Sequence, residues 1–127
     1  MDEKPFVLLC AANSAVTQPL MATLENAGYR VQAVDSAPDC VAAARRDPPA
    51  LILMDLMMPG VDAATASGLK KDAPEIEGVP VVFLSAMSEG QARVRPEDAG
   101  AAGYLLKPYR KDVLLECVSR HVSIPVA

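Results

Sequence analysis

The sequence predicts an α/β domain in which a parallel β-sheet carries helices on both faces. Short apolar runs recur along the 127 residues, and most of them lack polar alternation, which is typical of strands buried on both faces of a parallel sheet. Stretches with helical spacing lie between these runs. This alternation of strand and helix predicts right-handed crossovers and a sheet wound on both sides.

Five apolar runs are the expected strands of one sheet. Each is short and rich in Val, Leu and Ile, as strands of a buried sheet are. Because helical segments separate them, we expect every pair of neighbours to run parallel. The runs are Phe6–Cys10, Val31–Val34, Leu51–Met54, Val81–Leu84 and Tyr104–Leu106.

The first helix is expected between the first two strands, where Asn13 and Ser14 suit a turn or the start of a helix. Gly28 should end it, because glycine favours the position just past a helix. If Thr17 caps this helix, Pro19 falls in the first turn, where its missing N–H does no harm. Apolar residues at helical spacing define its buried side: Val16, Leu20, Leu24 and Ala27.

Four further segments have helical character. Ser36 is a candidate cap for the second, which Asp47 and two prolines end. Pro96 and two glycines weaken the segment Ser88–Ala102, since an interior proline costs about 3 kcal/mol in a helix. The four segments are Ser36–Asp47, Ala63–Lys71, Ser88–Ala102 and Arg110–Val122.

Composition excludes several classes of function. The net charge is −4 and no basic run stands out, so we expect no nucleic-acid binding. No apolar run reaches about 18 residues, so no membrane span is expected. The first residues, "MDEKPF", lack the basic and apolar regions of a signal peptide, which predicts a cytoplasmic location. We expect one domain over residues 1–127, with a core at about 5–122 and a loose tail at 123–127.

The cysteines and the single histidine predict structural roles. Cys10, Cys40 and Cys117 are far apart in the chain and form no CxxC motif, so we interpret them as small core residues in a reducing compartment. His121 lies near the end of the last helix, where a cation is favourable. Neither set indicates a catalytic nucleophile, and we expect that the chain is not an enzyme.

Polar residues follow three of the expected strands, and they indicate where the chemistry lies. Asp55 follows the third strand, Ser85 the fourth and Lys107 the fifth. In an open parallel sheet, ligands bind at the carboxyl ends of the strands, so these side chains should converge. A nucleophilic carboxylate, a hydroxyl and a fixed cation suit a transferred phosphoryl group.

Four motifs resemble those of the response-regulator receiver domain. They are "LENAGYRV", "PALILMDLMMPG", "VPVVFLSA" and "GAAGYLLKPY", in the family's order along nearly the whole chain. Thirty positions separate Asp55 from Ser85 and twenty-two separate Ser85 from Lys107, which matches the family pattern. The resemblance implies a flavodoxin-like, doubly wound sheet of five parallel strands in the order 2-1-3-4-5.

The same resemblance implies a role for each matching residue. Asp55 would be the phosphoacceptor. Ser85 would hydrogen-bond the phosphoryl group, and Lys107 would pair with one of its oxygens. The remaining matches are Tyr104 as the switch aromatic, Met57 as a backbone-carbonyl ligand of Mg²⁺, and Ala86 as the small residue that leaves the phosphate accessible.

The chain departs from the family where the metal should bind. Ala11 and Ala12 follow the first strand, where the family has two acidic residues that hold Mg²⁺. Mg²⁺ prefers oxygen ligands in octahedral geometry, and alanine side chains supply none. Asp55 and the Met57 carbonyl remain, with Asn13 able to contribute through water. If each lost carboxylate costs about tenfold in affinity, both together cost about a hundredfold, so we expect weak or absent Mg²⁺ binding.

A second departure concerns the expected partner surface. Pro96 and Glu97 stand where the family has small and apolar residues in its fourth helix. In the family, the face made by helix four, strand five and helix five contacts downstream partners. A broken helix there implies an altered partner surface. Ala63 replaces a common glycine, and we expect a minor effect from it.

The sequence is compatible with two functions. One is a phosphorelay receiver, in which Asp55 accepts a phosphoryl group from a histidine kinase or a phosphotransfer protein. The other is a pseudo-receiver that binds a protein partner without phosphorylation, which Ala11 and Ala12 favour. A flavodoxin-like enzyme lacks a catalytic histidine or cofactor fingerprint in this sequence. The resemblance also allows a homodimer.

Overall fold

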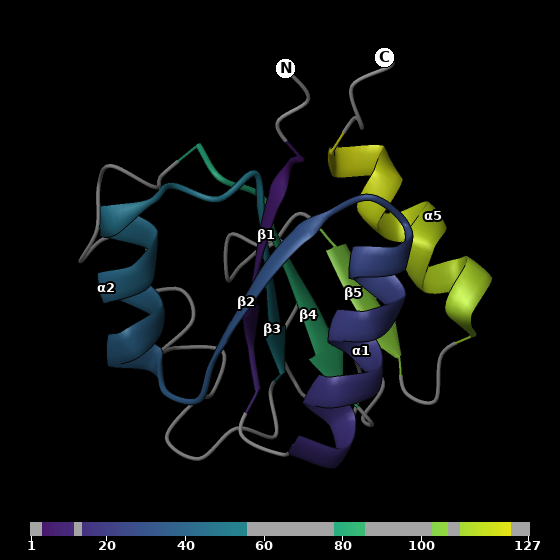
Figure 1. Cartoon of the computed structure of the whole chain (residues 1–127), viewed down its shortest axis with the longest axis horizontal. Helices are drawn as coiled ribbons and strands as arrows, with labels where there is room; N and C mark the ends of the chain where they lie inside the picture. The colour runs from purple at the N-terminus through teal and green to yellow at the C-terminus, as the bar shows by residue number, and fades with distance from the viewer. Residues whose placement is uncertain (1–3, 12–13, 56–77, 86–102, 107–109, 123–127) are drawn as a thin grey trace.

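The computed structural model describes residues 4–11, 14–55, 78–85, 103–106 and 110–122 of the chain (Figure 1). Within these residues, a central sheet lies between α2 on one side and α1 and α5 on the other. The strands are β1 (Phe6–Cys10), β2 (Arg30–Val34), β3 (Leu51–Asp55), β4 (Val81–Ser85) and β5 (Gly103–Leu106), and the helices are α1 (Ser14–Asn26), α2 (Ala37–Arg46) and α5 (Lys111–His121).

The sheet has the predicted topology. All five strands are parallel, in the order β2-β1-β3-β4-β5. Each strand coincides with an expected apolar run to within a residue at either end, and β3 extends to include Asp55. The reversal of strand order beside β1 creates the topological switch point at which ligands bind in such sheets.

Alternate residues of β1 divide the core into two apolar layers. Phe6, Leu8 and Cys10 belong to a cluster that includes residues of α2. Val7 and Leu9 belong to a second cluster, which includes residues of α1 and α5. Because successive side chains of a strand point to opposite faces, a continuous apolar run is what a sheet covered on both faces requires.

Helix α1 begins at Ser14, one of the two residues whose types suit a helix start. Thr17 is therefore a helical residue, and the alternative in which it caps the helix does not hold. Pro19 therefore lies inside the helix, where it cannot donate a backbone hydrogen bond to the carbonyl four residues earlier. Burial of Leu20 and Leu24 offsets this local cost, because helices in proteins are stabilised mainly by packing of their apolar face.

Gly28 ends α1 as expected, and the backbone shows why. Its φ is 103°, a left-handed conformation that favours glycine. The N–H of Gly28 donates to the carbonyl of Glu25 at 3.1 Å, and the N–H of Tyr29 donates to that of Leu24 at 3.1 Å. This pair of bonds is the Schellman motif, which satisfies carbonyls at the helix end.

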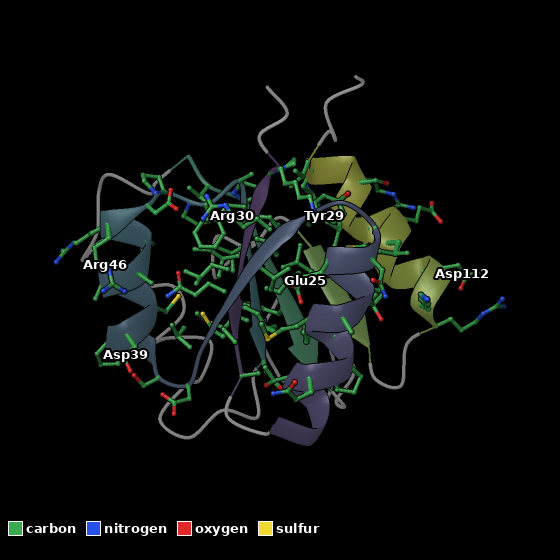
Figure 2. The ribbon with its side chains drawn as sticks, in the orientation of Figure 1. Glu25, Tyr29, Arg30, Asp39, Arg46 and Asp112 are labelled. Atoms are coloured by element: carbon green, nitrogen blue, oxygen red, sulfur yellow. The ribbon has the colours of Figure 1, made fainter. Side chains whose placement is uncertain are left out.

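Helix α2 has the predicted cap. The Ser36 side chain accepts a hydrogen bond from the N–H of Asp39 at 3.2 Å. At the other end, Asp47 forms an ion pair with Arg30 at 2.9 Å, and the Arg30 guanidinium lies 4.3 Å from the centre of the Phe6 ring. The ion pair joins the end of α2 to the start of β2, where Figure 2 labels Arg30, and the ring contact joins β2 to β1. Both charged side chains are about half exposed, so the pair contributes little stability.

The last helix, α5, covers the sheet with Leu114 and Val118, which are buried. Its last turn carries Arg120 and His121, and a cationic side chain there interacts favourably with the negative end of the helix dipole. The expected helices over Ala63–Lys71 and Ser88–Ala102, and with them the altered partner surface around Pro96, lie outside the described residues. None of the three described helices is long and apolar enough to span a bilayer.

Candidate functional site

The candidate site lies at the carboxyl edge of the sheet. Asp55 is the last residue of β3, and its Cα pairs with Leu84 of β4. Ser85, the next residue, ends β4 and pairs with Leu106, the last residue of β5. Ala11 follows β1 on the other side of β3. The structure therefore brings the ends of β1, β3, β4 and β5 to one edge, as the sequence predicted for the chemistry.

Asp55 is a buried carboxylate, with 3% of its surface exposed. It closes a strand whose other four residues are all buried and apolar, so the strand fixes its backbone rigidly. It takes part in a polar or electrostatic interaction, and no buried side-chain oxygen or nitrogen among the described residues lacks a hydrogen-bond partner. A buried, partnered carboxylate on a rigid strand is well placed for directed chemistry.

Ala11 occupies an apolar position beside Asp55. Cys10, the residue before it, has Met54 as its Cα partner on β3, so Ala11 and Asp55 lie on neighbouring strands at the same level. Ala11 is 4% exposed and belongs to the apolar cluster that packs against α1. Its N–H donates to the carbonyl of Val34 at 3.0 Å, which extends the pairing of β1 with β2 by one residue.

Several predicted site residues lie outside the described part of the chain. The backbones of Ser85 and Tyr104 are described, and Tyr104 pairs with Phe83 of β4. Their roles in switching stay predictions. The predicted residues outside the described segments are Ala12, Met57, Ala86 and Lys107.

The described residues offer a poor donor set for a metal ion. No three His, Cys, Asp or Glu side chains in the described segments lie close enough together to hold one ion. At the end of β1, Ala11 presents a methyl group to an apolar cluster and no oxygen ligand. The fit to Mg²⁺, which needs several hard oxygen ligands, is therefore poor on this side of Asp55.

The cysteines next to the site belong to the core, as predicted. Cys10 and Cys40 are fully buried in the same apolar cluster, whereas Cys117 is half-buried on α5. A hydrogen bond with Cys40, together with burial, raises the pKa of the Cys10 thiol far above its usual range. A thiol held in its neutral form is a poor nucleophile, so Cys10 acts as a packing residue.

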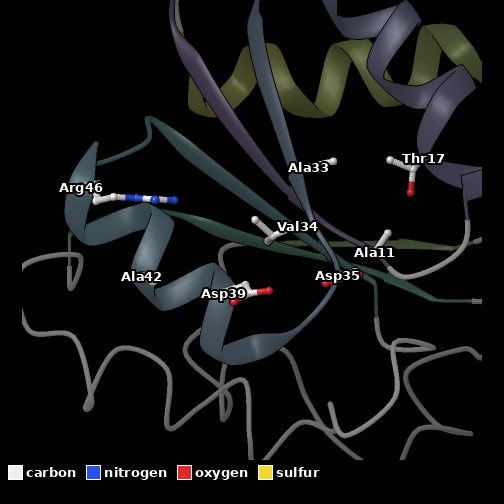
Figure 3. A pocket seen from close by; sticks show the side chains of 8 residues that line it. All are labelled: Ala11, Thr17, Ala33, Val34, Asp35, Asp39, Ala42 and Arg46. Atoms are coloured by element: carbon white, nitrogen blue, oxygen red, sulfur yellow. The ribbon is translucent and has the colours of Figure 1, made fainter.

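Sequence reasoning missed a cavity beside the edge strand. It has a volume of about 500 Å³ and lies between α2 and the carboxyl end of β2 (Figure 3). Asp35, Asp39 and Arg46 contribute charged side chains to its lining. The spacing of Asp39 and Arg46 places them on one side of a helix, which was a signal available in the sequence. The sequence did not indicate that β2 lies opposite that side of the helix.

Comparison with known proteins identifies the family. The model of the response regulator receiver domain matches residues 7–119. The protein PilH of Pseudomonas aeruginosa is 35% identical over 101 residues, covering 79% of this chain and 83% of PilH. The response regulator PleD of Caulobacter vibrioides is 38% identical over 87 residues, covering 68% of this chain, and the match spans only 19% of PleD.

Solved structures show the same fold. The chemotaxis protein CheY4 of Vibrio cholerae superposes with a TM-score of 0.85 at 21% identity, covering 94% of this chain and 100% of CheY4. The receiver domain of the sensor histidine kinase PA1611 of Pseudomonas aeruginosa, whose active-site cleft holds a magnesium ion, superposes with a TM-score of 0.83 at 28% identity, covering 94% of this chain and 98% of that one. With its sheet order, its buried Asp55 and these matches, the chain belongs to the response-regulator receiver domain family of two-component signalling.

Proposed function

We propose that this receiver domain signals through Asp55 and that it has lost most of its dependence on Mg²⁺. The observation that carries the proposal is the row at the carboxyl edge of the sheet, where a buried Asp55 lies beside a buried Ala11. The first residue supplies the nucleophile of a receiver. The second occupies a family position for a metal-binding acid and supplies no ligand.

In the proposed reaction, Asp55 takes a phosphoryl group from phosphohistidine. A carboxylate oxygen attacks phosphorus, the O–P bond forms, and the N–P bond breaks with its electron pair going to the imidazole nitrogen of the donor. Lys107 and the Ser85 hydroxyl would stabilise the phosphoryl oxygens as charge develops. Ala86 would leave the approach open, and inward rotation of Tyr104 would report the change.

The proposed partners follow from the family. The donor would be a histidine kinase or a phosphotransfer protein, and the output would be a protein contact at the face that includes β5 and α5. The described part of α5 presents a mixed charged surface, with a Glu116–Arg120 ion pair at 2.6 Å and Val113 43% exposed. Such a surface suits a protein partner better than a nucleic-acid backbone.

Loss of metal binding is the part of the proposal specific to this chain. In the PA1611 receiver domain, the active-site cleft holds a magnesium ion. Here Ala11 lies in an apolar cluster, and the family resemblance gives Ala12 the second acidic position. Without these carboxylates, Mg²⁺ would gain too little to leave its hydration shell.

A pseudo-receiver is the second candidate function, and Ala11 is the observation that favours it. A residue 4% exposed, in contact with apolar neighbours, has become part of the core. If the residues at the end of β1 serve only to pack the core, the domain would bind its partner in one fixed state. Asp55 would then be a structural carboxylate.

Phosphotransfer from a small donor separates these candidates. The protein is incubated with acetyl phosphate, with and without millimolar Mg²⁺, and the intact mass is followed, with Asp55→Asn as control. We expect an adduct of one phosphoryl group on the native chain, none on the variant, and similar rates with and without Mg²⁺. No adduct under either condition would support the pseudo-receiver. An adduct that forms about a hundredfold faster with Mg²⁺ would contradict loss of the metal site.

A further inference from the structure

The cavity beside β2 is a concave site whose lining includes three charged side chains and does not include Asp55. Its volume of about 500 Å³ falls within the range of small-molecule sites, and it is open to solvent, because Asp35, Asp39, Ala42 and Arg46 are exposed. Among the residues that the structure describes, Ala11 both lines this cavity and lies beside Asp55, and Asp55 itself does not line it. Val34 of β2 and Ala42 of α2 supply an apolar floor and wall.

Charges of opposite sign lie at different ends of this cavity. Asp39, Ala42 and Arg46 are spaced so that they share one side of α2. Figure 3 shows the Arg46 side chain extending from α2 toward β2, and the Asp39 carboxylate pointing toward the end of β2, where Asp35 lies. Two carboxylates therefore lie at one end, and one guanidinium lies at the other.

These charges are available to a ligand. Among the described residues, Asp35 and Arg46 form no ion pair, with each other or with a neighbour. Asp39 and Arg46 are seven positions apart on α2, so their Cα atoms are separated by about 10.5 Å along the helix axis. At this distance the two side chains make contact only if the arginine bends toward the acid. The gap between them is lined by Ala42, whose small side chain leaves room.

We propose that this cavity binds a short aliphatic molecule with a cationic group at one end and a carboxylate at the other, the chemistry of a basic amino acid. The cation would lie between Asp35 and Asp39, the aliphatic chain against Val34 and Ala42, and the carboxylate on Arg46. The three charged side chains sum to −1, and a basic amino acid with two cationic groups and one carboxylate sums to +1. The net charges are opposite in sign, and the side-chain cation and the carboxylate follow the order of their partners along the cavity. The α-ammonium group would lie beside the carboxylate, where the cavity is open to solvent.

The same chemistry occurs in two sources, free basic amino acids and basic residues at the carboxyl terminus of a protein. Both present a free carboxylate and a side-chain cation joined by an aliphatic chain. A short peptide that ends in lysine, compared with its carboxyl-terminal amide, distinguishes the second source from the first.

An amide NMR titration of the whole chain tests the proposal, with L-lysine as the probe. We expect saturable shifts at Val34, Asp39 and Ala42, with smaller effects from norleucine, which lacks the side-chain cation, and from cadaverine, which lacks the carboxylate. Added salt should weaken the binding, because the charges are exposed.

Two matched variants make the test specific. Arg46→Gln should weaken lysine binding about threefold or more and leave cadaverine unchanged, since only the carboxylate contact is lost. Arg45→Gln, one residue earlier on α2 and outside the cavity lining, should leave lysine binding unchanged. Absence of saturable shifts, equal shifts with norleucine, or equal weakening by both variants would overturn the proposal. Saturable shifts with the lysine-terminated peptide and none with its amide would extend the site to protein termini.

Discussion

At the scale of single residues, the account depends on two neighbours with opposite characters. Asp55 is a carboxylate that the fold keeps buried, and Ala11 is a methyl group beside it. In a receiver with an intact acidic pair, several carboxylates would compete for one lysine. Because alanine stands at both of these acidic positions here, we expect a direct ion pair between Asp55 and Lys107.

This ion pair predicts different costs for its two halves. Lys107→Ala should lower the free energy of unfolding by about 3 kcal/mol, because it leaves the buried carboxylate of Asp55 without its cation. Asp55→Asn should cost less, since the amide oxygen still accepts a hydrogen bond from the lysine. Urea denaturation of both variants measures the difference. Equal losses, or a greater loss for Asp55→Asn, would rule out the pair.

At the scale of elements, the end of α1 is the best-defined local structure. The positive φ of Gly28 lets two hydrogen bonds close the helix and directs the chain into β2. Gly28→Ala should therefore destabilise the fold by about 1–2 kcal/mol, because an L-residue is strained there. Gly78 has open space around the position of a Cβ and no positive φ, so Gly78→Ala should change stability by less than about 0.5 kcal/mol. Thermal unfolding of the two variants, side by side, tests this; similar losses would show that the φ at Gly28 does not matter.

Some of these elements could be predicted from the sequence and others could not. The strands were predictable, because a run such as Leu51–Met54 is apolar throughout and is followed by a polar residue, Asp55. Asp55 was found for the same reason. The start of α1 at Ser14 was one of two alternatives that the sequence left open, and the position of Pro19 inside the helix was not predictable, since burial of Leu20 and Leu24 offsets its local cost. Helix propensity gives only a weak preference for where a helix begins, and burial of apolar side chains in the folded protein can override it.

Contacts between elements were beyond the sequence pattern. Cys10 and Cys40 come from β1 and α2, and nothing in their spacing indicates that the two thiols meet. The cavity at β2 likewise depends on how α2 lies across the sheet, because this arrangement places Asp35 and Arg46 in the lining of the same cavity. Such features arise from the docking of one element on another, which periodicity within a segment does not encode.

At the scale of the whole molecule, the buried Cys10 thiol links stability to pH. Hydrogen bonding to Cys40 and burial raise its pKa in the folded chain above the ordinary value of 9.0. The neutral thiol is thus favoured in the folded state, and this stabilisation is complete below about pH 9 and is lost progressively as the pH rises above it. Each pH unit above about 9 should remove up to about 1.4 kcal/mol through this one group.

Chemical denaturation between about pH 7 and about pH 10.5 measures this effect. Cys10→Ala should be less stable near neutrality, because it leaves a cavity, but its stability should fall less steeply with pH. Cys117→Ala is the comparison: burial raises the pKa of that half-buried thiol too, but the charge of the nearby Arg120 opposes the rise, so its removal should reduce the pH dependence less than Cys10→Ala does. If the free energy of unfolding of Cys10→Ala fell with pH as steeply as that of the native chain, another group would be responsible for the pH dependence.

In the receiver as a whole, we propose that Asp55 occupies an active-site position from which the metal has been lost. A Mg²⁺ titration followed at the amides of Ala11 and Asp55 tests it most directly, with Ala11→Asp combined with Ala12→Asp as the variant that restores the acidic pair. We expect no saturable shifts in the native chain at millimolar Mg²⁺, and saturable shifts in the variant with at least about a hundredfold gain in affinity. Saturable binding to the native chain below about 1 mM would contradict the claim.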